Sequence, residues 1–212
     1  MATKDWFRNT EWNAAIEADF RTGMSRARSG RSQYLRIQAS YLADSHPRVA
    51  LALLDEFFAS TDLFDAAQAH VDRARAFVAL GDLDAAMSSY EDALQREREF
   101  PRLRTTAYTD YACLVANHHV ASRYSRALEV LNARPEEPLF PLERYRKHGA
   151  RALLLLDLGR DEEAVRAAES AMEAARQVSS GLRYHPHLGL VEDINDEFGR
   201  RVATLARRRP QA

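Results

Sequence analysis

The sequence contains few of the residues that punctuate or cross-link a chain. Of 212 residues, eight are glycine, seven are proline and one is cysteine. The single thiol, Cys113, cannot form an intrachain disulfide, which favours a reducing compartment. It lies in an apolar segment with helical spacing, so we expect a buried structural residue rather than a nucleophile. The scarcity of glycine and proline, beside abundant Ala, Leu, Arg and Glu, favours helix along the whole chain.

Long hydrophobic runs are also missing. Uninterrupted apolar runs, such as residues 49–54 and 152–156, are far too short to span a bilayer. A secretory signal would require an apolar stretch soon after Met1, and the sequence has none there. We therefore expect a cytoplasmic protein without a membrane partner.

Lysine is nearly absent. Lys4 and Lys147 are two of the 30 basic residues, which leaves 28 arginines. Since arginine codons are rich in G and C, this bias suggests a GC-rich, bacterial source. The formal net charge of −1 predicts no bulk attraction to nucleic acid. The basic run at 207–209 favours such a partner, but the other arginines are dispersed, so we expect no nucleic-acid binding.

No motif of an enzyme or cofactor site occurs. The chain has no glycine-rich phosphate loop, no G-x-S-x-G elbow and no HExxH sequence. His118 and His119 are adjacent, so they point to different faces of a helix. His185 and His187 lie in a predicted loop, without Cys or acidic residues at ligand spacing. We predict a non-enzymatic protein with no catalytic residues, cofactor or metal, although a site assembled across helices would escape such motifs.

The stretch 68–101, QAHVDRARAFVALGDLDAAMSSYEDALQREREFP, has the clearest organisation. Apolar and small residues recur at spacings of three and four on each side of Gly81-Asp82, which predicts two amphipathic helices. Gly81 is expected to close the first helix in the left-handed conformation, and Asp82 to cap the second. Small residues allow the two helices to approach closely: Ala74, Ala86 and Ala93.

This pattern resembles a tetratricopeptide repeat, a helix pair of about 34 residues. Three further units align with it through alanines separated by 36, 41 and 37 residues: Ala50, Ala86, Ala127 and Ala164. The resemblance implies an all-α fold, a right-handed α-solenoid of antiparallel helix pairs over residues 32–178. The third unit has no glycine at the position of Gly81, so we expect its turn to differ.

The two ends of the chain are expected to cap this array. Residues 1–31 are predicted to form an N-terminal capping helix that begins after Thr10. Residues 179–212 are predicted to form a loop and a C-terminal capping helix.

In this family the first helix of each pair lines a concave groove that holds an extended peptide or a partner helix. Carried over by position, the resemblance implies a partner-binding set: Arg36, Gln68, Asp72, Arg75, Tyr108, His119, Arg146 and Arg151. Guanidinium groups such as Arg75 and Arg146 can hold a carboxylate through two parallel hydrogen bonds. The chain lacks the Lys/Asn/Arg clamp of the members that bind peptide carboxylates. The alternative interpretation is that these arginines and Arg36 are solvated or paired with Asp72 or neighbouring acids.

These features favour a protein–protein interaction scaffold or adaptor that binds a peptide or partner protein in the groove. The alternative is a peptide- or ligand-sensing regulatory protein that acts through a partner. A homodimer is also open, because Phe198 and Leu205 on the last helix are expected to be exposed and able to pair across a two-fold axis.

Overall fold

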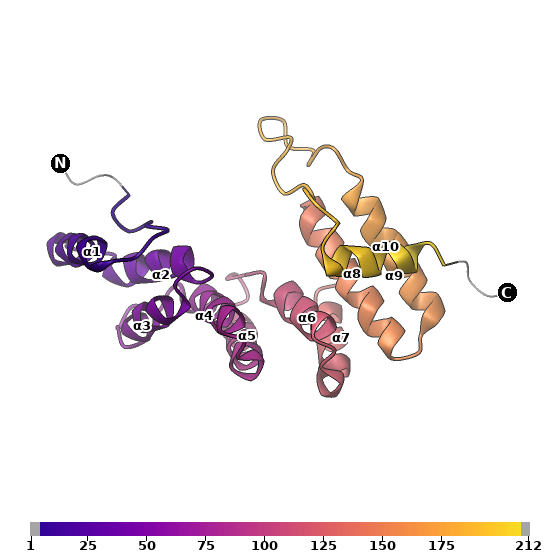
Figure 1. Ribbon diagram of the computed structural model, residues 1–212, viewed down its shortest axis with the longest axis horizontal. Helices are drawn as coiled ribbons and strands as arrows, with labels where there is room; N and C mark the ends of the chain where they lie inside the picture. Colours follow the sequence, from indigo (N-terminus) through magenta and orange to yellow (C-terminus); the bar gives the residue numbers. More distant parts are fainter. Residues whose placement is uncertain (1–4, 209–212) are drawn as a thin grey trace. The chain divides into compact units, whose positions relative to one another are not determined.

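The computed structural model describes residues 5–208, so Lys4 and Arg209 of the sequence analysis lie outside it. Over that range the chain is all-helical and has no strand, which confirms the all-α prediction and is consistent with a helical repeat of tetratricopeptide type (Figure 1). No helix in the described range is long and apolar enough to cross a membrane. The elements are α1 (Ala14–Arg26), α2 (Arg31–Leu42), α3 (Pro47–Phe58), α4 (Ala66–Leu80), α5 (Leu83–Glu99), α6 (Ala107–Asn117), the 3-10 turn η1 (Ala121–Arg123), α7 (Tyr124–Asn132), α8 (Pro141–Asp157), α9 (Asp161–Ala175) and α10 (Glu197–Ala206).

The helices form two compact units. The N-terminal unit ends at Ala107 and the C-terminal unit begins at Tyr108. In the first, α2 packs on α3 and α4 on α5, and α3 and α4 join the two pairs. In the second, α8 packs on α9, and α10 lies against both. The boundaries of the repeat array at residues 32 and 178 stay predictions.

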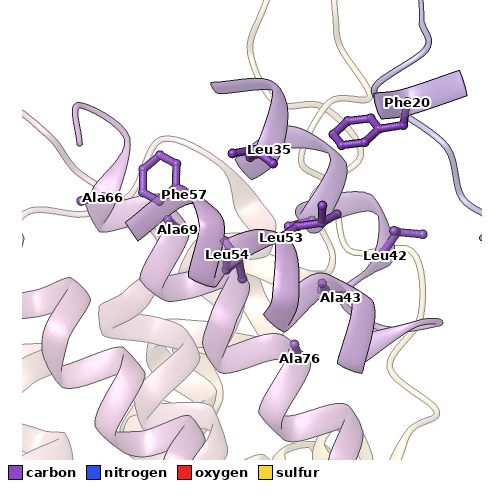
Figure 2. Packing of buried hydrophobic residues seen from close by; sticks show 12 residues of the cluster. Phe20, Leu35, Leu42, Ala43, Leu53, Leu54, Phe57, Ala66, Ala69 and Ala76 are labelled. Atoms are coloured by element: carbon purple, nitrogen blue, oxygen red, sulfur yellow. The ribbon is translucent and has the colours of Figure 1, made fainter. Parts of the chain in front are cut away.

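The N-terminal unit has a core built from four helices (Figure 2). Phe20 of α1, Leu35 of α2, and Leu53 and Phe57 of α3 belong to this one buried cluster. The α4 contribution consists of alanines, which bring its backbone close to α3. All these side chains are almost fully buried, and the apolar surface they remove from water stabilises the unit by about 25 cal/mol per Å².

The segment before α1 folds back onto this core. The Trp6 ring lies 5.5 Å from the Phe20 ring and 5.0 Å from the Tyr34 ring. Gln38 is fully buried, and its amide bonds the backbone of Asn9 in both directions: its Nε2 donates to the Asn9 carbonyl (2.8 Å), and its Oε1 accepts from the Asn9 N–H (3.1 Å). These bonds satisfy a buried amide that would otherwise be costly.

The start of α1 corrects the sequence prediction. Asn13, not Thr10, caps the helix, and its side-chain oxygen accepts from the backbone N–H of Ala15 and Ile16 at 3.0 Å each. Asn is a strong N-cap residue, so both positions had suitable chemistry. Thr10 instead uses its carbonyl to accept from the Ser45 hydroxyl (3.3 Å), which ties the N-terminal segment to the end of α2.

The turn between α4 and α5 forms as predicted. Gly81 has φ +77°, and the N–H of Asp82 donates to the carbonyl of Phe77 (3.0 Å), which closes the helix. The Asp82 side chain then accepts from the N–H of Ala85 (3.1 Å) as the cap of α5.

The glycine-free turn after α6 uses the same closure. His119 takes the left-handed conformation, with φ +51°, and the N–H of Val120 donates to the carbonyl of Val115 (3.1 Å). The expected difference appears only afterwards, where η1 is inserted before α7. A residue with a Cβ is strained in this conformation, and within the described range His119 is the only non-glycine residue that adopts it.

A comparison of His119→Gly with His119→Ala isolates this strain. Both changes remove the imidazole, but only glycine adopts the left-handed conformation without cost. We expect the glycine variant to be more stable by about 1 kcal/mol in urea unfolding. Equal stability of the two variants would contradict the left-handed turn.

α10 covers the second pair of the C-terminal unit. Phe198 and Leu205 are 7% and 2% exposed, so the expectation that these two side chains are exposed is wrong, whereas the homodimer itself stays a prediction. The Phe198 ring meets Tyr145 of α8 edge-on at 5.7 Å. A Cβ added to Gly149 would lie only 2.6 Å from Phe198 Cζ, so this glycine allows the two helices to touch.

Replacement of Gly149 by alanine should therefore weaken the docking of α10. Because the added methyl group would overpack the contact with Phe198, we expect a loss of about 1–3 kcal/mol in unfolding free energy and faster hydrogen exchange in α10. Truncation of the facing ring, Phe198→Leu, should make the same alanine less costly in a double-mutant cycle. Additive effects of the two changes would disprove the contact.

Candidate functional site

Four of the predicted partner-binding residues gather in the N-terminal unit. Gln68, Asp72 and Arg75 lie on one face of α4, at i, i+4 and i+7, and Arg36 lies on α2. Asp72 accepts a hydrogen bond from Gln68 Nε2 at its Oδ1 (3.2 Å), and its Oδ2 lies 3.6 Å from Arg36 Nη1. Arg75 Nη1 is 3.8 Å from Asp72 Oδ1. The structure therefore brings these four side chains into one network, which we call the α2–α4 network.

Asp72 is the buried centre of the α2–α4 network. Its side chain is 1% exposed, and its Oδ2 has no hydrogen-bond donor although Arg36 is near. Burial raises the pKa of Asp72 to about 6, and Arg36, Gln68 and Arg75 offset only part of this effect. The ionised carboxylate is therefore held in an unfavourable place at neutral pH.

Two further acids, one exposed and one partly buried, complete the α2–α4 network. Asp44, just after α2, forms an ion pair with Arg75, and its side chain is 72% exposed. Asp65 Oδ2 lies 3.7 Å from Arg36 Nε. Both arginines are thus paired with acids in the free protein, as the alternative interpretation from the sequence proposed.

Two further predicted residues contact acids across α6 and α8 of the C-terminal unit. The Tyr108 hydroxyl donates to Glu143 Oε1 (2.8 Å). Arg146 Nη1 lies 2.8 Å from Asp110 Oδ1, and the Arg146 side chain is 38% exposed. Tyr108 and Arg146 therefore lie on the facing sides of α6 and α8.

His119 and Arg151 lie elsewhere in that unit. His119 Nδ1 is 3.1 Å from Asp157 Oδ2, at the end of α8, and the same oxygen accepts from the Tyr124 hydroxyl (2.8 Å). Arg151 hydrogen-bonds the side chain of Asn132, at the end of α7. Because Arg151 is five positions after Arg146, it points about 140° around α8 from it. The structure does not bring these two residues together with Arg146.

Asp72 was predicted from the sequence, but the other acidic partners were not: Asp44, Asp65, Asp110, Glu143 and Asp157. Their positions carry a usable signal, because partners on neighbouring first helices lie about one repeat apart. Arg36 and Asp72 are separated by 36 residues, as are Ala50 and Ala86. Tyr108 and Glu143 are separated by 35. Residues at equal positions of adjacent repeats can thus be tested for opposite charge.

Metal-ligand groups and the cysteine are two possible kinds of chemical site among the described residues. No group of three or more His, Cys, Asp or Glu side chains within residues 5–208 is placed to hold a metal ion. Cys113 is buried, and burial raises the pKa of its thiol above the ordinary value, which makes it a poor nucleophile.

Residues 67–100 match the family model described as tetratricopeptide repeat. The matched segment is the α4–α5 pair, so the resemblance predicted for residues 68–101 is confirmed. No curated protein and no solved structure matches the chain. The repeat suggests a protein–protein interaction module in general terms.

The raised pKa of Asp72 gives a testable pH dependence. The folded protein keeps the proton of the Asp72 carboxyl up to about pH 6, whereas the unfolded chain loses it near pH 3.8. The protonated Asp72 therefore adds most to the stability of the fold at low pH, and this contribution is lost as pH rises through about 6. Asp72→Asn has no such titration, so it serves as the reference. Between about pH 5 and about pH 7.5, the unfolding free energy of wild type should fall by about 1 kcal/mol relative to that of Asp72→Asn. A difference that stays constant over this range would contradict the burial of a poorly bonded carboxylate.

Proposed function

We propose that this protein is an interaction scaffold that holds an acidic segment of a partner protein on the first helices of its pairs. The single observation that carries the proposal is the α2–α4 network, where Arg75 lies between a buried carboxylate and an exposed one. In the C-terminal unit, Arg146 offers a second partly exposed guanidinium beside Asp110.

The state of Arg75 explains why an acidic partner suits this surface. Asp72 lies on the same helix and is buried, so it stays in place when a partner binds. Asp44 is exposed, and an exposed ion pair contributes at most about 1 kcal/mol. Replacement of Asp44 by a partner carboxylate therefore costs little free energy, and Arg75 then donates a charge-assisted hydrogen bond to the partner.

The proposal is tested by selecting peptides from a random library on the purified protein. We expect enrichment of Asp- and Glu-containing peptides and at least about tenfold weaker binding by Arg75→Glu, because a charge-assisted bond is lost and a repulsive charge is added. Arg146→Glu tests the second guanidinium in the same way.

Matched controls reverse arginines outside this surface. Arg48 is exposed on α3, the second helix of its pair, and Arg200 is exposed on α10. Arg48→Glu and Arg200→Glu should leave affinity unchanged, with all variants folded by circular dichroism. Selected peptides that bind Arg75→Glu and Arg146→Glu as tightly as wild type would overturn the proposal. A peptide that also changes the hydrodynamic radius would favour the regulatory alternative.

A further inference from the structure

A cleft of about 500 Å³ opens in the C-terminal unit, and its lining includes neither Arg146 nor any residue of the α2–α4 network. One wall is a stripe of α8 that includes Lys147, His148 and Arg151, and the opposite wall is a stripe of α9 that includes Glu163 and Arg166. The end of α7 and the connection to α8 complete it. Its volume is within the range of small-molecule sites.

The cleft exists because α7 is short. α7 has nine residues and ends at Asn132, whereas α9 has fifteen. Pro135 and Pro138 in the connection cannot continue the helix. The flank of α8 beyond Asn132 is therefore left without a covering helix, and polar side chains line it.

Both carboxylates that line the cleft form ion pairs within the protein. Glu137 lies 3.0 Å from His148 Nε2 and 3.6 Å from Lys147 Nζ. Lys147 is itself 3% exposed and donates to the carbonyl of Glu136 (2.8 Å), so its ammonium is fixed in the wall. Glu163 pairs with Arg160 at 2.7 Å, which helps hold the pKa of this carboxyl below its usual value.

Arg151 differs from the other cations of the cleft. Its guanidinium hydrogen-bonds the neutral amide of Asn132, and within the described residues it has no carboxylate at ion-pair distance. Its Nε is buried and lacks a hydrogen-bond acceptor. Arg166 lies on the facing helix, with a side chain 65% exposed. The cleft thus has one guanidinium that is bound to a neutral amide and, among the described residues, has no ion pair, an exposed guanidinium on the facing helix that pairs with Glu162 (3.6 Å), and apolar lining from Leu155 and Ala167.

We propose that this cleft binds a small organic anion, whose carboxylate or phosphate group is held by Arg151 and closed over by Arg166. A planar guanidinium suits both groups, since each offers oxygens that accept parallel hydrogen bonds. The walls of Leu155 and Ala167 contact the carbon part of the ligand. This site is independent of the partner surface on α2 and α4.

The test uses isothermal titration of the full chain with inorganic phosphate and, separately, with succinate, at constant ionic strength set by sodium chloride. We expect saturable binding with a Kd of about 1 mM or tighter for at least one probe. Preference for phosphate identifies a phosphorylated ligand, and preference for succinate identifies a carboxylate. Binding of both supports an anion site that accepts either group.

The diagnostic variant is Arg151→Gln, with Arg144→Gln as its matched control. Arg144 also lies on α8, also donates to a neutral amide (Gln177, 2.9 Å), and also has a buried Nε without an acceptor, but it does not line the cleft. We expect at least about tenfold weaker binding by Arg151→Gln and wild-type affinity for Arg144→Gln.

Two further measurements keep the proposal falsifiable if Arg151→Gln is unstable. Arg166→Gln removes an exposed side chain and should weaken binding severalfold, and amide chemical shifts of Ala167 and Ser170 should move on titration. Absence of binding by wild type to both probes would overturn the proposal. So would equal affinity of wild type, Arg151→Gln and Arg166→Gln.

Discussion

Close approach of neighbouring helices across buried alanines is the constraint on which the rest of the structure depends. Ala50, Ala74, Ala86 and Ala164 are fully buried. A small side chain at each contact sets the helices close together and so fixes their register. Register in turn decides which polar residues of neighbouring helices face each other. The pairing of Arg36 with Asp72, and of Arg146 with Asp110, follows from this register.

The same constraint explains how much could be predicted. The α4–α5 pair was predictable because its helices, its Gly81 turn and its Asp82 cap are all set by local chemistry. The left-handed His119 was not, since residues with a Cβ rarely adopt that conformation and only the surrounding packing selects it. Asn13 displaced Thr10 as a cap because the preceding segment packs on α2, which is a long-range contact.

Part of the candidate site was predictable from local helical spacing, and part depends on contacts between distant segments. Gln68, Asp72 and Arg75 share a face by helical spacing alone, so their grouping is visible in the sequence. The separation of Arg151 from Arg146 follows from helical spacing too, but its contact with Asn132 depends on where α7 ends. The burial of Phe198 likewise depends on Gly149, which lies on another helix. Non-local packing thus decides both the cleft beside α8 and the loss of an apolar terminal face.

The arginines are paired internally and are also the proposed partner contacts, and these two roles are compatible. An internal acid holds each guanidinium in a defined place, which lowers the entropy lost when a ligand binds. Hydrogen exchange of the protein with a selected acidic peptide tests this account most directly. The account predicts added protection in α2 and α4, residues 31–42 and 66–80. Protection confined to α3 and α5, the second helices of those pairs, would contradict it.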